Sequence, residues 1–174
     1  MIFPKEGLQF LRNLKANNNR DWFIANKSRY EQHVKNPTET LSAALAEALS
    51  QMLRSPVEAK IFRLHRDVRF SKDKTPYNTH VRLAFWDSNS STQKAMGGPA
   101  FYLSIEADLL VIGAGCMAMA PALLEAYRQK VTAAGDQLQA LINTLTDKGA
   151  RFDPAALKRV PRGYDKDHPC SALL

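Results

Sequence analysis

The chain has 174 residues, of which 45% are hydrophobic and 24% charged, and it carries a formal net charge of +7. This length and composition are typical of one globular domain with its own core, and no apolar run approaches the roughly 18 residues of a membrane-spanning helix. The positive charge favours anionic partners, among them nucleic acid, nucleotides, phosphorylated metabolites and a membrane surface.

The N-terminus and the cysteines favour a cytoplasmic protein. The first ten residues lack the basic region and the following apolar region of a secretory signal. Cys116 and Cys170 form no CxxC pair, and two reduced thiols are expected rather than a disulfide. His65, His80 and Glu106 stand at spacings unrelated to a zinc pattern, so no metal site is predicted, and the sequence identifies no cofactor.

The first third of the chain predicts three helices. Leucines recur at helical spacing until the three asparagines at 17–19 stop the pattern, and a second helix is expected to begin near Arg20. Asn36 and Pro37 predict the start of a third helix, with Asn36 as its N-cap. This helix is expected to turn four apolar side chains toward the core: Leu41, Leu45, Leu49 and Met52.

The middle third predicts strands, because its apolar residues alternate with polar ones. Phe62 to Phe70 is expected to be a half-buried strand, with Arg66 marking a bulge or an inward charge whose partner is Glu106 or Asp67. Further strands are expected at 79–86, 101–106 and 109–112, and helices return after them. The pattern predicts an α+β fold over 1–174 as a single domain, in which an antiparallel sheet of about four strands is packed by N-terminal and C-terminal helices.

The first two expected strands form a hairpin with a concentration of charge. Between Ile61 and Arg82, six basic residues face two acidic ones, and unpaired charge of this kind must turn toward water or toward an anion. On the expected strand, Asp67 lies between two arginines on one face and is expected to orient their guanidinium groups. We therefore expect a site for an anionic, phosphate-bearing small molecule. Its predicted anion-binding residues here are Arg63, Arg66, Arg69, Lys72 and Lys74.

Other interpretations of the basic hairpin stay open. An enzyme could use Asp67 or His80 as a general base and Tyr77 as an acid. A nucleic-acid-binding module could combine the same basic residues with aromatic stacking faces. A purely structural network of arginine and aspartate would bind no ligand at all. The sequence makes no prediction about the oligomeric state.

Four stretches of the chain resemble a known family in their order and spacing. They are LKANNNRDWFIANKSRYE (14–31), FRLHRDVRFSKDKTPYNTH (62–80), PAFYLSIEADLLVIGAG (99–115) and LKRVPRGYDKDHP (157–169). The family is the one catalogued as domain of unknown function 2461, and the resemblance covers almost the whole chain. The resemblance implies a bacterial-type cytosolic protein. The family has members in fungi as well, and it has no established activity.

The resemblance also extends the expected site. It adds Arg162 as an anion-binding residue, and supporting residues that lie within the matching stretches: Asp73, Tyr102, Glu106, Tyr164 and His168. The chain departs from the family pattern at Met117, where relatives usually carry a large aromatic residue. Relatives also continue past Leu174 into another helical stretch, so the resemblance implies a short form or a lost C-terminal part.

Overall fold

The computed structural model describes residues 3–89, 98–153 and 159–174. These residues fall into two compact units, Met1–Ala118 and Met119–Leu174. The first unit contains helices followed by a sheet, so the predicted α+β class is confirmed. The single domain expected from the sequence stays a prediction. Within the described ranges, no helix has both the length and the apolar character needed to cross a membrane.

The first unit begins with a helical layer. Its elements are α1 (Lys5–Ala16), α2 (Arg20–Ala25), α3 (Lys27–Tyr30), the π-helix η1 (Glu31–Lys35) and α4 (Asn36–Leu53). The predicted start of α2 is confirmed, because the Asn19 side chain caps it by accepting a hydrogen bond from the backbone N–H of Trp22 at 2.9 Å.

The predicted N-cap at Asn36 is wrong. Asn36 has helical backbone angles, φ −60° and ψ −44°, and the chain runs through η1 into α4 without a break. Pro37 cannot donate to the carbonyl four residues earlier, and the wider π turn just before it accommodates the missing bond. The helix ends where Arg54 adopts a left-handed conformation. Its last expected core residue, Met52, is 63% exposed.

The sheet is an antiparallel meander in the order β1-β2-β3-β4. Its strands are β1 (Val57–Ile61), β2 (Val81–Asp87), β3 (Ala100–Ile105) and β4 (Leu110–Gly115). The prediction placed the last three strands correctly to within a few residues. In β4, however, the strand continues past the expected end at Ile112, and Gly115 pairs with Ala100.

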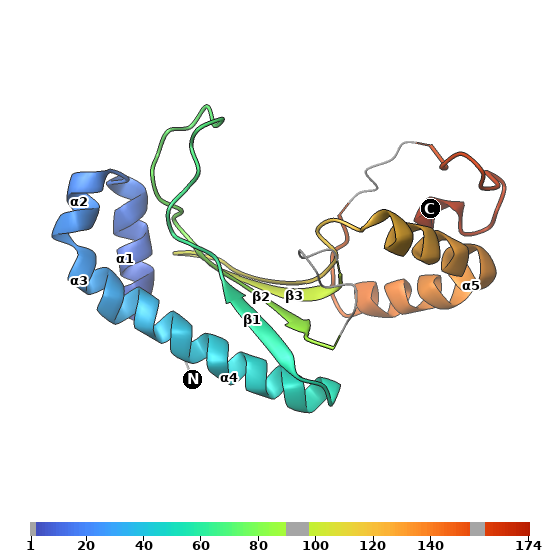
Figure 1. The fold of residues 1–174 in the computed structure, drawn as a ribbon, viewed down its shortest axis with the longest axis horizontal. Coiled ribbons are helices and arrows are strands. Elements are labelled where there is room, and N and C mark those ends of the chain that lie inside the picture. The colour runs from blue at the N-terminus through green and yellow to red at the C-terminus, as the bar shows by residue number, and fades with distance from the viewer. Residues whose placement is uncertain (1–2, 90–97, 154–158) are drawn as a thin grey trace. The chain divides into compact units, whose positions relative to one another are not determined.

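The predicted first strand, 62–70, is wrong. The strand lies earlier, at 57–61, and residues 62–80 form a long loop that extends away from the sheet (Figure 1). In this loop the structure has one isolated bridge, between His65 and Tyr77. The alternating pattern is misleading because its apolar side chains have different environments: Leu64 is buried in the core, whereas Phe70 is 96% exposed.

The core lies between the helical layer and one face of the sheet. Leu83 and Phe85 of β2 point into it, as do Leu11 and Leu14 of α1. Tyr77, near the end of the loop, stacks on Phe23 of α2 with ring centroids 4.3 Å apart. One end of the loop is therefore packed into the core while its tip is free in solvent.

The second unit consists of α5 (Pro121–Asp147), a C-terminal segment and the short 3-10 helix η2 (Ser171–Leu173). Helix α5 has a kink at Ala134, whose backbone angles are not helical. The C-terminal segment lies against this helix: the Tyr127 hydroxyl donates to the carbonyl of Leu173 at 2.9 Å, and Gly135 lies beside Cys170.

Candidate anion-binding site

The base of the 62–80 loop is fixed by contacts with the helical layer. The Asn18 side chain holds the backbone of Tyr77 with two hydrogen bonds: its Nδ2 donates to the carbonyl at 2.8 Å, and its Oδ1 accepts from the N–H at 3.1 Å. Across the loop, the N–H of Arg66 donates to Pro76 at 2.8 Å, and that of Asn78 donates to Leu64 at 2.7 Å. These bonds give the lower loop a defined shape in spite of its irregular backbone.

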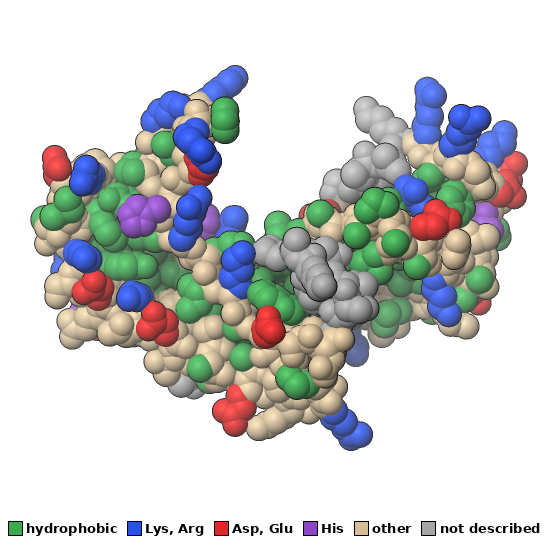
Figure 2. All heavy atoms as spheres, in the orientation of Figure 1, with side chains coloured by type: hydrophobic (Ala, Val, Ile, Leu, Met, Phe, Trp, Pro, Cys, Tyr) green, Lys and Arg blue, Asp and Glu red, His purple; other side chains and the backbone are tan. Residues whose placement is uncertain are grey.

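His80 occupies the central position at this base. Three hollows of about 310, 180 and 370 Å³ share it as a lining residue. The first hollow gathers most of the positive charge: it is lined by Arg63, Arg66 and Arg82 together with His65 and Asp67. Lys and Arg side chains gather over the extended loop in Figure 2, which also shows that their heads reach solvent.

The other two hollows bring in the helical layer. The second is bordered by Tyr30 and Glu39, close to where η1 passes into α4. Burial raises the pKa of Tyr30, with further contributions from Glu39 and Glu31. The third reaches α1 through Lys15 and continues along the loop. The site is thus built from helices and loop together.

The surroundings of His80 favour its neutral form. Burial lowers the pKa of His80, the nearby Arg82 and Arg66 lower it further, and Glu106 acts in the opposite direction. Because the ordinary pKa of histidine is already below 7, the imidazole is uncharged at neutral pH. An anion placed among these arginines would shift that balance toward the imidazolium form.

Arg66 is held by the loop itself. Its guanidinium group donates to the Asp73 carboxylate and to both the hydroxyl and the carbonyl oxygen of Thr75. The expected partners, Glu106 and Asp67, are therefore wrong for this arginine. The backbone N–H of Thr75 and the Arg66 guanidinium lower the pKa of Asp73 to about 2, so Asp73 stays ionised and keeps Arg66 in place.

Asp67 holds a different arginine. It accepts from Arg69 Nε at 2.9 Å and from Arg69 Nη2 at 2.6 Å, so the two side chains form a two-point ion pair. These bonds lower the pKa of Asp67. The expected contact of Asp67 with Arg69 is present, while its role in orienting arginines for an anion stays a prediction. Arg69 is not among the described residues that line the three hollows, whereas Arg63 and Asp67 share the first one.

The remaining predicted residues of the first unit are scattered. Lys72 and Lys74 lie exposed toward the loop tip, where the Lys74 ammonium donates to the carbonyl of Val68 at 2.9 Å. Tyr77 is 5% exposed in the core, and Tyr102 is on β3 with its pKa raised by burial. The structure thus brings only part of the predicted set together.

Three predicted residues belong to the second unit. The Tyr164 hydroxyl donates to Glu125 at 2.9 Å, and the His168 ring lies 3.2 Å from the carbonyl of Thr132. Arg162 is exposed in the turn that Gly163 completes with φ 93°. All three residues are thus placed within the second unit alone, and their participation in the anion site stays a prediction.

Sequence reasoning missed several lining residues. Arg82 belongs to the basic run but was not assigned to the site, although it follows His80 by two residues at the start of β2 and lines the same hollow. Lys15, Asn18 and Asn78 were also missed, and in the case of Lys15 no signal in the sequence links α1 to the loop. In the part of the chain that the structure describes, no three His, Cys, Asp or Glu side chains are grouped to hold a metal ion.

Comparison with known proteins supports the resemblance seen in the sequence. The family model described as "Conserved hypothetical protein (DUF2461)" matches residues 6–174. No curated protein and no solved structure matches the chain. Since the matched region includes both units, the protein belongs to the DUF2461 family of conserved hypothetical proteins.

Proposed function

We propose that the hollow next to His80 binds a small molecule that carries a phosphate group. The observation that carries this proposal is the meeting of Arg63, Arg66 and Arg82 around one hollow of about 310 Å³. Guanidinium groups present paired donors that match the oxygens of a phosphate, and a hollow of this size lies at the small end of ligand sites.

The charge balance supports an anion rather than a neutral ligand. In the described part of the chain, neither Arg63 nor Arg82 takes part in an ion pair. Arg66 is already positioned by Asp73 and Thr75, so little side-chain entropy is lost when it binds. Among the described residues that line this hollow, Asp67 is the one with a carboxylate, and it is engaged with Arg69.

The test is calorimetric titration with inorganic phosphate and with sulfate. A charge-assisted hydrogen bond contributes about 1.5–3 kcal/mol, so Arg82→Ala is expected to weaken binding about tenfold or more. Lys72→Ala is the matched control, because it removes the same charge from the neighbouring loop, at a residue that does not line the hollow, and it is expected to change the affinity less than about twofold. Equal losses in both variants would show diffuse attraction to the loop and would refute a defined site.

A second candidate function rests on the loop tip. Phe70 is 96% exposed, the Arg69 guanidinium lies 5.9 Å from its ring centre, and Lys72 and Lys74 follow closely in the chain. An exposed aromatic face among cations suits stacking on an unpaired base, so the tip is a candidate contact for single-stranded nucleic acid. Fluorescence anisotropy with a labelled oligonucleotide should then show binding that weakens with salt and with Phe70→Ala. Salt-sensitive binding that Phe70→Ala leaves unchanged would exclude stacking by this residue.

Acid–base catalysis at the same site stays an open alternative within this proposal. His80 is the strongest candidate for a general base, because its neutral imidazole can accept a proton from a bound ligand. Turnover of phosphate esters by the wild type, lost in His80→Gln, would establish an enzyme. The cytoplasmic location expected from the sequence is also retained here, with cell fractionation as its test.

A further inference from the structure

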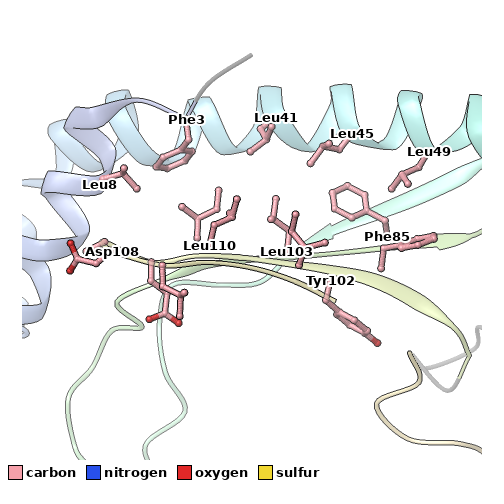
Figure 3. A pocket seen from close by; sticks show the side chains of 16 residues that line it. Phe3, Leu8, Leu41, Leu45, Leu49, Phe85, Tyr102, Leu103, Asp108 and Leu110 are labelled. Atoms are coloured by element: carbon pink, nitrogen blue, oxygen red, sulfur yellow. The ribbon is translucent and has the colours of Figure 1, made fainter. Parts of the chain in front are cut away.

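The strongest unexplained feature of the first unit is an apolar cavity between α4 and the sheet. It has a volume of about 700 Å³ and is lined by residues of both layers. In Figure 3, Leu41, Leu45 and Leu49 point from α4 toward the sheet, and Leu103 and Leu110 point from β3 and β4 toward the helix. The cavity therefore has two walls that face each other.

This cavity is too large to be a packing defect. Protein interiors are close-packed, and voids larger than a water molecule are few. Here the two walls stay apart, and β4 residues Leu110 and Ile112 are 59% and 74% exposed. A volume of this size lies well within the range of small-molecule sites, which are concave and mostly apolar.

The shape of the helical wall favours an elongated ligand. Leu41, Leu45 and Leu49 follow one another at four-residue spacing, so they form a continuous apolar row about 12 Å long on one face of α4. At the α1 end the row is continued by Phe3 and Leu8. A linear apolar chain laid along α4 could contact all of these side chains at once.

The polar groups at the cavity restrict the ligand's head group. Apart from Tyr102, Glu106 and Asp108, its described lining residues are apolar, and none of them is Lys or Arg. Tyr102 points away from α4 in Figure 3. Asp108 pairs with Arg12 of α1, which neutralises one of the two carboxylates, and Glu106 remains. This is an acidic border in a chain whose net charge is +7.

We propose that this cavity binds a small amphiphile with a linear apolar chain and an uncharged or cationic head group. A carboxylate head, as in a fatty acid, would lie beside Glu106 with no lysine or arginine among the described lining residues to balance it. This site is separate from the anion-binding proposal, because among the residues that the structure describes, none that lines a hollow around His80 also lines this cavity.

The test uses the whole chain and the uncharged fluorescent probe N-phenyl-1-naphthylamine. We expect saturable binding of one probe molecule, and displacement by decanol and decylamine at lower concentrations than by decanoate. Ile112→Asp places a carboxylate on the cavity wall, whereas Val111→Asp makes the same change one residue earlier on the opposite face of β4. The first should weaken probe binding about tenfold and the second less than about twofold.

A second variant guards against a folding defect in Ile112→Asp. Leu45→Trp puts a larger apolar side chain into the open volume, so it should abolish probe binding without lowering the melting temperature. The proposal is overturned if no saturable binding occurs, if the two aspartate variants behave alike, or if decanoate competes best. A dimer that Ile112→Asp separates and Val111→Asp does not would assign this face to a second copy of the chain and would also overturn it.

Discussion

Replacing Asn18 with alanine should loosen the base of the loop and destabilise the first unit. The Asn18 side chain makes two hydrogen bonds to the backbone of Tyr77, at 2.8 and 3.1 Å, and Tyr77 is only 5% exposed. Each such bond contributes about 1 kcal/mol net, so Asn18→Ala should cost about 2 kcal/mol. The cost rises if water cannot reach the two backbone groups left without a partner.

Urea unfolding followed by tryptophan fluorescence measures this change, because Trp22 lies in the same unit and packs against its core. The matched control is Asn17→Ala. Asn17 is the exposed residue that follows α1, and its side chain donates to the carbonyl oxygen of Asn13 one turn earlier, so the control should cost less than about 0.5 kcal/mol. Equal free energies of unfolding for the two variants would refute the idea that Asn18 anchors the loop. Asn18→Ala should also weaken phosphate binding, because Arg66 and His80 flank the anchored segment.

Three further predictions concern close contacts and charge. Gly7→Ala should destabilise the protein by about 1–2 kcal/mol in urea unfolding, although alanine normally favours a helix, because the new Cβ would clash with the carbonyl oxygen of His33. The control Gly113→Ala, with nothing within 4 Å of its Cβ, should be near neutral, and a stabilised Gly7→Ala would contradict the contact. Sulfate, whose charge is constant between about pH 5 and 8, should bind more tightly as the pH falls, because the pKa of His80 is lowered in the free protein and rises when an anion binds. Calorimetry should show a weaker pH dependence in His80→Gln, and an unchanged pH dependence would remove His80 from the site. Gly135→Ala places a Cβ 2.7 Å from the Cβ of Cys170, so it should displace the C-terminal segment. In a Cys116→Ser background, Cys170 should then react faster with a thiol reagent, whereas an unaltered rate would mean that the segment does not pack on this glycine.

The lowered pKa of His80 also makes the stability of the folded protein depend on pH. A histidine whose folded pKa is lowered binds fewer protons in the folded state than in the unfolded state at pH values between its folded pKa and about 6.5. Without an anion, the free energy of unfolding should therefore fall as the pH drops through this window, and saturating sulfate should reduce that fall. Thermal denaturation at several pH values, with and without sulfate, measures the difference.

Most of the fold could be predicted from local signals. The Asn19 cap, the leucine spacing of α1 and the alternation in β2 and β3 each act over a few residues, and the structure agrees with them. The first strand was missed because β1 is short and four of its five residues are exposed, so it carries little alternating pattern. The stronger pattern at 62–70 arises in a loop, where one residue enters the core and another reaches solvent.

The site was less predictable, because its contacts join distant parts of the chain. The pair of Asp67 and Arg69 is two residues apart, and the sequence predicted it. The arrangement of Arg66 depends on how the loop folds back to Asp73 and Thr75, which no periodic pattern records. The positions of Lys15 and Asn18 beside His80 depend on the packing of α1 against the loop. The Asn18 side chain contacts Tyr77, which is 59 residues later in the chain.

Alternation along β2 separates the two proposed sites from each other. Arg82 lines the basic hollow, while Leu83, the next residue, is buried in the core on the face that meets the helices. The apolar cavity lies on that helix-facing side, between Phe85 or Leu103 and α4. Glu106 borders the apolar cavity and also acts electrostatically on His80, so a cationic head group in the cavity could influence the anion site. An uncharged ligand has no such charge to exchange with Glu106, and it would alter anion binding only if the sheet itself has two arrangements. Sulfate at saturation should therefore change the dissociation constant of N-phenyl-1-naphthylamine by less than about twofold, and Arg82→Ala should leave probe binding intact. A tenfold shift in either measurement would mean that the sheet transmits a conformational change and that the two sites act as one.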